Sequence, residues 1–236
     1  MKRTFRTFTH RDATYRVLAD RFAEARQAVL ELRTDLEAFI RTYPSFAASF
    51  DPVELPSSAP AAACRMAEAA QRAGVGPMAA VAGTFAECAA RAAAEAGAPE
   101  AIVDNGGDLF LILQRPALIG LYAGATSLTN ELAFAVEPQD TPLAICSSSS
   151  RMGHSDSLGD CDLATVTAGS GALADAAATQ AANLVRDAAD IDAALQRIGG
   201  IPGVLGVLIV KDGRIGMVGC LPRLTRGAKH ADRKTV

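Results

Sequence analysis

The chain has 236 residues and a mass of 24.4 kDa, enough to bury a core without disulfides or structural metal ions. Half of its residues are hydrophobic and the net charge is −3, which excludes a disordered chain and the basic footprint of a nucleic-acid-binding protein. Residues 1–41 and 223–236 are basic, whereas residues 42–222 carry nine bases and nineteen acids, so a phosphate ligand held there would need a metal cation.

The N-terminal part of the chain predicts a hairpin followed by a long helix. Residues 4–9 and 14–19 alternate bulky or β-branched side chains with polar ones around a polar turn, which indicates a hairpin within residues 1–19. Apolar residues then recur at three- and four-residue spacing, which predicts a long helix over 20–42 that ends before Pro44. We expect its basic face to be solvated surface.

The next part of the chain predicts two alanine-rich helices. Residues 51–60 contain three prolines and indicate a connector, and residues 61–73 are typical of a helix that ends at a Gly-Val-Gly-Pro sequence. Small residues dominate the following helix, 78–96, so a neighbouring backbone or a flat ligand can approach it closely. Tight helix packing is the simpler explanation of that composition.

The remaining chain predicts a series of strands and two helices. Short apolar runs at 101–103 and 109–113 flank a Gly-Gly turn, and an Asp-Gly turn separates 204–210 from 215–221; both patterns are typical of hairpins. Further strands are expected at 119–123, 132–136, 143–146 and 163–167, and further helices at 172–185 and 190–198.

The chain as a whole predicts one α+β domain over residues 1–236, with β-sheets flanked by helices and a basic tail at 223–236. Its five cysteines are scattered and odd in number, which indicates reduced thiols. The first residues lack the apolar core of a signal peptide, and no charge-free window reaches the roughly 18 residues of a membrane span. We therefore expect a cytoplasmic protein without a membrane span.

The first candidate site is the turn from Asp104 to Asp108. Gly106 and Gly107 permit positive φ and leave backbone N–H groups open to a ligand, while Asn105 and Asp108 add side-chain hydrogen bonds. A dinucleotide-binding loop is excluded because it needs G-x-G-x-x-G before a helix, and a strand pattern follows here. The alternative is an ordinary hairpin turn.

The second candidate site is the loop 146–159, which is rich in serine and glycine and leaves a buried strand. The hydroxyls of Ser147, Ser148 and Ser149 can bind a heterocycle or phosphate. His154 is the one of three histidines that lies outside the basic ends, and it can exchange a proton near neutral pH. A Ser–His–Asp hydrolase lacks support because no G-x-S-x-G elbow is present, and a flexible serine loop is the remaining alternative.

The third candidate site is the pair Asp175 and Thr179. On a helix, residues four apart share a face, so a carboxylate and a hydroxyl present two hard oxygen donors to one point, which suits Mg²⁺. Only alanines lie between them, so a bulky cofactor has room to approach. The alternative is that Asp175 merely favours the helix dipole from the first turn.

In this order, the three motifs resemble the ApbE-type FAD:protein FMN transferase superfamily, and more closely a cytoplasmic ApbE-like branch of it. The resemblance runs from the N-terminal hairpin to about Asn183. Its most specific segments are Gly76–Gly83, Asp104–Asp108, Gly153–Ser155 and Ala174–Thr179.

The resemblance implies that Asp175 and Thr179 bind Mg²⁺ and that the Gly-Gly-Asp segment helps to shape a flavin site. His154 aligns with the histidine of the flavin-site loop, so His154 and Asp175 are the candidate catalytic residues. Enzymes of this type move FMN from FAD to a threonine of a partner flavoprotein. The chain departs from the transferase pattern because no Pro-x-Thr-Gly follows His154, and from the branch because Ser147–Ser150 replaces Thr-Ser-Ser-Gly.

The leading hypothesis is an enzyme that binds FAD, with Mg²⁺ bridging the pyrophosphate to Asp175 and Thr179, and that transfers FMN or cleaves the pyrophosphate. His154 would act as an acid or base, or would only orient the ligand. A non-catalytic flavin- or nucleotide-binding module is the competing hypothesis. A third is a scaffold protein whose Ala/Gly-rich helices form an oligomer interface, and a homo-oligomer is expected on general grounds.

Overall fold

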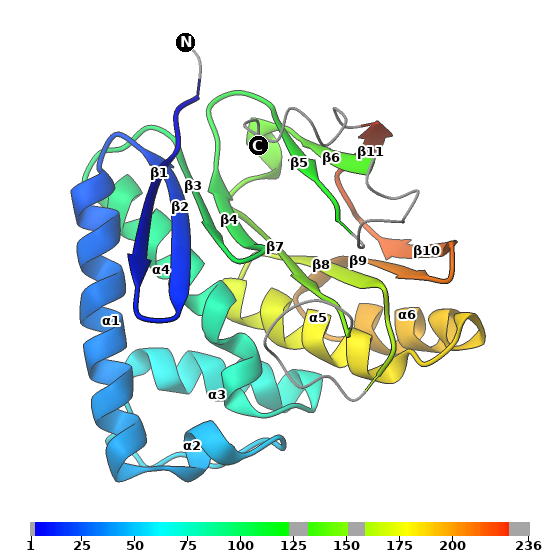
Figure 1. Cartoon of the computed structure of the whole chain (residues 1–236), viewed down its shortest axis with the longest axis horizontal. Coiled ribbons are helices and arrows are strands. Elements are labelled where there is room, and N and C mark those ends of the chain that lie inside the picture. The colour runs from blue at the N-terminus through cyan, green and yellow to red at the C-terminus, as the bar shows by residue number, and fades with distance from the viewer. Residues whose placement is uncertain (1–2, 123–131, 151–158, 227–236) are drawn as a thin grey trace.

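The computed structural model describes residues 3–122, 132–150 and 159–226. The elements form three layers, in which helices cover one face of an eight-stranded sheet and a three-stranded sheet covers the other (Figure 1). This mixture of helices and sheets confirms the predicted α+β class. One apolar core lies between the helices and the large sheet, and a second lies between the two sheets.

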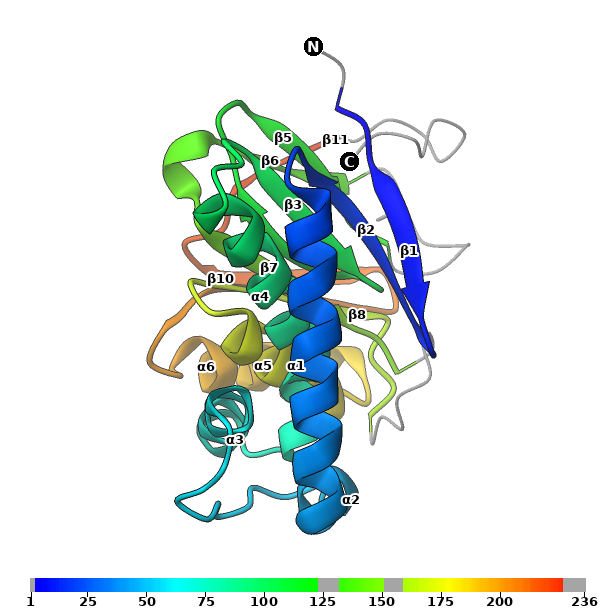
Figure 2. The same ribbon diagram turned by 90° about the vertical axis from the view of Figure 1, so that its left-hand side faces the viewer.

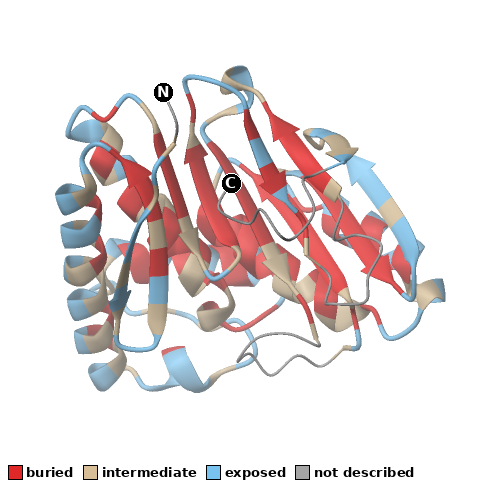
Figure 3. Cartoon of the chain, turned by 45° about the horizontal axis from the view of Figure 1, so that its top comes forward, coloured by how far each residue is buried: buried red, intermediate tan, exposed pale blue. Residues whose placement is uncertain are grey.

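The large sheet has the strand order β1-β2-β3-β4-β7-β8-β9-β10, and all its neighbouring strands are antiparallel. Its strands are β1 (Arg6–His10), β2 (Ala13–Ala19), β3 (Ala101–Asn105), β4 (Asp108–Ile112), β7 (Leu143–Ser148), β8 (Leu163–Ala168), β9 (Val204–Lys211) and β10 (Arg214–Gly219). Most of these strands are buried on both faces, and β10 at the edge is mostly exposed (Figure 3).

The N-terminal hairpin β1–β2 is followed by the long helix α1 (Phe22–Thr42), as predicted. The helix runs alongside the hairpin (Figure 2) and buries one stripe of residues spaced three to seven apart: Ala25, Val29, Leu36 and Phe39. A four-residue helix, α2 (Ser45–Ala48), follows where the sequence predicted no element, and it buries Phe46 completely.

The helical layer contains α3 (Ala61–Ala73), the 3₁₀ turn η1 (Pro77–Ala80), α4 (Val81–Glu95), α5 (Gly171–Leu184), the 3₁₀ turn η4 (Ala188–Asp190) and α6 (Ile191–Gly199). Four of the seven alanines of α4 and all those of α5 are buried within the chain's own core, where their small side chains bring the helix backbones together. The buried faces of these two helices are therefore covered by the chain's own core, and the scaffold hypothesis stays a prediction.

The small sheet has the order β11-β6-β5 and packs its apolar residues against the large sheet. Its strands are β5 (Ala117–Gly120), β6 (Leu132–Val136) and β11 (Arg223–Arg226), and the short 3₁₀ turn η3 (Pro138–Asp140) follows β6. Arg223–Arg226 pairs with β6, so the first four residues of the expected basic tail are a strand instead. The remainder of that tail, and the end of the strand expected at 119–123, lie outside the described residues.

Two further expectations concern the whole chain. All five cysteines have free thiols, in agreement with the prediction of reduced cysteines. Within the described ranges, every helix is too short or too polar to cross a lipid bilayer.

Candidate functional site

The Gly-Gly turn between β3 and β4 is a two-residue hairpin loop. Gly106 and Gly107 both have positive φ, +73° and +112°, and Asn105 pairs with Asp108 across the turn. Such a loop requires residues that tolerate the left-handed region, which explains the two glycines. Apart from its chain neighbours, no atom of the described residues lies within 4 Å of the position that a Cβ would take on either glycine, so these residues leave the rim of the turn open.

Asn105 connects this turn to two other elements. Its Nδ2 donates to the carbonyl oxygen of Ala82, at the start of α4, over 3.2 Å. Its side chain also forms a hydrogen bond with the hydroxyl of Tyr15 on β2. Tyr15 is buried, and this burial raises its pKa to about 12. The turn is thus fixed to the N-terminal hairpin and to the first turn of α4, two partners that the sequence did not predict.

Asp175 lies on α5 and points to the same first turn of α4. Its Oδ2 accepts a hydrogen bond of 2.8 Å from the backbone N–H of Gly83. The N-terminal turn of a helix carries unpaired N–H groups and a partial positive charge, so it stabilises a carboxylate. Thr179 follows one turn later on α5 and is half-buried. The helix therefore gives Asp175 and Thr179 the shared face that their spacing predicted.

Asp108 and Asp175 form a pair of buried carboxyl groups, only 8% and 9% exposed. Burial raises the pKa of Asp108 to about 7. Hydrogen bonds from the Cys146 thiol and the Ser147 N–H lower this pKa, but burial has the larger effect. Burial and the charge of Asp108 together raise the pKa of Asp175 well above its ordinary value. Among the described residues, no Lys, Arg or His side chain forms an ion pair with either carboxyl.

The serines at the end of β7 contribute differently from one another. Ser147 Oγ forms a hydrogen bond of 2.9 Å with Thr165 Oγ1, on the sheet face opposite to that of Cys146. Ser147 therefore binds Asp108 through its backbone N–H and not through its hydroxyl. Ser148 ends the strand half-buried, and Ser149 is buried directly after it. His154 lies outside the described residues.

The first turn of α4 is thus the point at which the candidate residues meet. Asn105 binds its carbonyl at Ala82 and Asp175 binds its N–H at Gly83. Sequence reasoning selected Asn105, Asp108 and Asp175 but did not predict that this turn binds them. Its sequence signals are the run of small residues, which predicted a close backbone approach, and the segment Gly76–Gly83, which carries part of the family resemblance.

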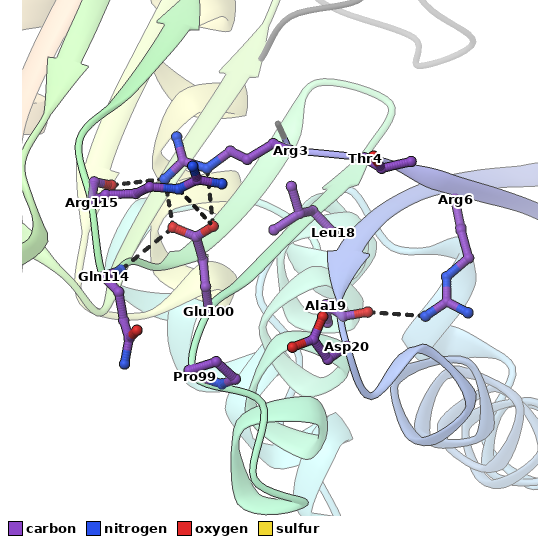
Figure 4. Close-up of a pocket in the computed structure, with 10 residues that line it drawn as sticks. All are labelled: Arg3, Thr4, Arg6, Leu18, Ala19, Asp20, Pro99, Glu100, Gln114 and Arg115. Carbon is purple, nitrogen blue, oxygen red and sulfur yellow. Dashed lines mark hydrogen bonds and ion pairs between the residues drawn. The ribbon is translucent and has the colours of Figure 1, made fainter. Parts of the chain in front are cut away.

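A cavity of about 530 Å³ lies at the other end of strands β2–β4 (Figure 4). Arg3 donates there to both oxygens of Glu100, at 3.0 and 2.5 Å, and to the backbone carbonyls of Arg115 and Pro116. Arg6 donates to the backbone carbonyl of Ala19. Because the protein itself engages these groups, the cavity is a structural ion-pair cluster rather than a second candidate site.

Comparison with known proteins places this chain in a family. The family model described as AbpE bacteria matches residues 9–212. The chain belongs to this ApbE-like family. Among its relatives, the UPF0280 protein of Methanocella arvoryzae is 40% identical over 208 residues, which cover 88% of this chain and 84% of the relative. The UPF0280 protein of Archaeoglobus fulgidus is 40% identical over 215 residues, 89% of this chain and 88% of its own.

Solved structures share the fold at low sequence identity. The ApbE protein of Thermotoga maritima superposes with a TM-score of 0.55 and 13% identity, covering 99% of each chain. The apo form of the flavinyl transferase ApbE of Pseudomonas stutzeri gives a TM-score of 0.53 at 14% identity, covering 92% of this chain and 94% of its own. These similarities confirm the predicted ApbE-like fold.

Proposed function

We propose that this ApbE-like protein is an enzyme that binds FAD together with Mg²⁺, with Asp175 and Thr179 as the metal ligands. The observation that carries the proposal is the buried pair Asp108 and Asp175, which lacks a counter-cation among the described residues. Two buried carboxyl groups of like charge favour either a proton or a cation. The flavinyl transferase activity named for the Pseudomonas stutzeri neighbour supports a flavin nucleotide as the ligand.

The donor set fits Mg²⁺. Carboxylate and hydroxyl oxygens are hard ligands, and Mg²⁺ is commonly held by one or two carboxylates while substrate phosphates and water complete its shell. No group of three or more His, Cys, Asp or Glu side chains gathers among the described residues. The chain would therefore supply few ligands and the diphosphate of FAD the others, which makes metal binding and flavin binding interdependent.

In the proposed reaction, the P–O bond that joins FMN to AMP within FAD breaks. The FMN phosphorus bonds to the oxygen of an acceptor hydroxyl, the proton of that hydroxyl leaves, and AMP departs with the electron pair of the broken bond. Bound Mg²⁺ would neutralise the diphosphate and stabilise the departing phosphate. The family resemblance supports a threonine of a flavoprotein as the acceptor; water in its place would give FMN and AMP.

The chain's own residues would bind and orient the nucleotide. Asn105 is fixed by Ala82 and Tyr15, so the open rim at Gly106 and Gly107 is held in place beside the carboxyl pair. We propose that this rim, together with Asp108 and the serines Ser147, Ser148 and Ser149, lines the flavin pocket. His154 is assigned the proton transfer on the family resemblance alone.

The test is FAD binding with and without Mg²⁺, measured in wild type and Asp175→Ala. The chain has no Trp, so flavin fluorescence is read without interference from indole emission. We expect Mg²⁺ to tighten FAD binding in wild type, and Asp175→Ala to weaken the Mg²⁺-dependent binding by at least about 100-fold, or ~2.7 kcal/mol. The matched control is Asp35→Ala, an exposed aspartate within α1, which should bind as wild type does. Undiminished Mg²⁺-dependent binding in Asp175→Ala would refute the metal role.

A second measurement separates the enzyme from a binding module. Wild type is incubated with FAD, Mg²⁺ and a flavoprotein acceptor, and released AMP is quantified. Release that depends on Asp175 supports the enzyme. Tight FAD binding without AMP release, with either the acceptor or water, favours the non-catalytic module, for which the missing Pro-x-Thr-Gly is the motive.

A further inference from the structure

Helices α4 and α5 cross in backbone contact at two glycines. A Cβ on Gly83 would lie 2.2 Å from the carbonyl oxygen of Gly171, and a Cβ on Gly171 would lie 2.1 Å from the carbonyl oxygen of Gly83. Both distances are far below van der Waals contact, so neither position accepts a side chain without moving the other helix. The first turns of the two helices are therefore held at one fixed separation.

A carboxylate follows each glycine at the same spacing and binds the opposite helix. Gly83 N–H donates to Asp175 Oδ2 over 2.8 Å, and Gly171 N–H donates to Glu87 Oε2 over 2.7 Å. Each helix thus carries a glycine with an acid four residues later, and each acid pairs an N–H group that has no partner within its own helix. The Ser170 cap of α5 is weaker, since its Oγ lies 3.5 Å from Leu173 N.

The two acids of this reciprocal contact differ in their surroundings. Glu87 also accepts from Arg91 Nε over 2.7 Å, so its charge is balanced by the protein, and its side chain is 16% exposed. Asp175 instead faces the second buried carboxyl, Asp108. Glu87 therefore performs a structural contact, whereas Asp175 makes the same contact without a basic partner among the described residues.

We propose that Glu87 is a positioning residue for Asp175: by binding Gly171 N–H it fixes the start of α5, and so holds Asp175 against Gly83. The expected effect of Glu87 on Mg²⁺ and FAD binding rests on the proposed function, because Asp175 is the proposed Mg²⁺ ligand. Glu87 itself would touch neither metal nor flavin. Loss of its hydrogen bond frees α5 to shift along α4, which moves Asp175 and Thr179 together.

The experiment compares Glu87→Ala, Glu87→Gln and Arg91→Ala, each checked for folding by thermal unfolding. Two quantities are measured: the Mg²⁺ concentration for half-maximal FAD binding, and the hydrogen exchange of the Gly83 and Gly171 amides by NMR without ligand. Glu87→Ala should raise the Mg²⁺ midpoint at least tenfold and speed exchange at both amides. Glu87→Gln keeps an acceptor oxygen. Arg91→Ala removes the ion pair and the cation–π contact of Arg91 with the Phe110 ring but leaves the hydrogen bond from Gly171, so both variants should stay within threefold of wild type.

The Gly83 amide distinguishes the possible failures. Its partner is Asp175, so faster exchange at Gly83 in Glu87→Ala reports displacement of Asp175 even when no flavin binds. Unchanged exchange at Gly83 overturns the positioning role, and so does a Mg²⁺ midpoint within threefold of wild type in a folded Glu87→Ala. If wild type binds no FAD with Mg²⁺, the proposed function fails while the exchange result still decides the role of Glu87. Should Glu87→Ala not fold, Glu87→Asp, which is one methylene shorter, replaces it under the same criteria.

Discussion

Two carboxyl sites lie at opposite ends of strands β2–β4, the half-buried Glu100 and the buried pair Asp108 and Asp175, and they differ in how their charge is balanced. At one end, burial favours the neutral form of Glu100, but hydrogen bonds and charge from Arg3 outweigh it and hold the pKa of Glu100 below its ordinary value. At the other end, burial raises the pKa of Asp108 to about 7, and no described cation pairs with it. Among the described residues, the protein supplies cations for the first site and none for the second.

This difference shows that unbalanced charge, not empty volume, identifies the candidate site. The cavity of about 530 Å³ lies beside Glu100, where arginines already bind the carboxylate (Figure 4). The carboxyl pair lies instead at a crossing of helix backbones. A buried carboxyl group without a counter-charge destabilises the fold, and for that reason such groups are candidates for functional sites.

The largest expected effect is at the helix crossing beside the carboxyl pair. Gly83→Ala would place a methyl group 2.2 Å from the carbonyl oxygen of Gly171, so the helices must separate. We expect a loss of about 3 kcal/mol in the free energy of unfolding, measured by urea denaturation. Gly169→Ala is the control, because no atom of the described residues beyond its chain neighbours lies within 4 Å of its added Cβ. Equal stability of the two variants would show that the crossing tolerates separation.

Asp108→Asn tests the uncompensated charge directly. The pKa of Asp108 rises from 3.8 in the unfolded chain to about 7 in the fold, so the folded state keeps a proton that the unfolded state releases. Stability of metal-free wild type should therefore fall as the pH rises from about 4 to about 7. Asp108→Asn should lessen this fall and be more stable than wild type by about 2 kcal/mol at pH 8. A variant that is less stable than wild type at pH 8 would contradict this account.

Glu100→Gln should show the opposite sign. Because the pKa of Glu100 is lowered in the fold, its charge stabilises the protein above the unfolded value of 4.5, and that stabilisation is lost as the pH falls through the lowered pKa. We expect a cost of about 1.5 kcal/mol at pH 7 that shrinks toward zero at pH 3, read from thermal unfolding across pH. FAD binding should be unaffected, since Glu100 lies at the far end of the strands. A constant cost at all pH values would assign the effect to packing.

The smallest effect on the free energy of unfolding is expected at an exposed ion pair, whose comparison with Glu100 shows how much burial adds to the strength of such a pair. Glu68 and Arg72 form an ion pair one turn apart on α3, with side chains 63% and 45% exposed. Glu68→Gln should cost only about 0.3 kcal/mol, and less in high salt. A cost as large as that of Glu100→Gln would mean that burial is not the reason why the ion pair of Glu100 contributes more to stability than the ion pair of Glu68.

Local patterns predicted most of the fold correctly. The periodicity of apolar residues gave α1, helix-forming composition gave α3, and alternating or continuous apolar runs gave the strands, because these signals depend on neighbouring residues. The four-residue helix at Ser45–Ala48 was missed since it is shorter than any recognisable period. Strand β11 at Arg223–Arg226 was missed because its partner, β6, lies about ninety positions earlier in the chain.

The candidate site was predictable only in part, for the same reason. The spacing of Asp175 and Thr179 and the Gly-Gly turn are local patterns, and the structure shows the helix and the hairpin loop that they predicted. The contacts of Asn105 with Ala82, and of Glu87 with Gly171, join residues 23 and 84 positions apart. Such contacts depend on how the helices dock, which no local pattern encodes.

The placement of β11 has a consequence for synthesis on the ribosome. Strands β5 and β6 emerge early, but the small sheet gains its third strand only after residue 226 has been translated. Until then β6 presents an open edge that is able to pair with another nascent chain. A C-terminal truncation at residue 222 would make that vulnerable intermediate permanent, so a shortened gene product should aggregate although every residue of the helical layer is present.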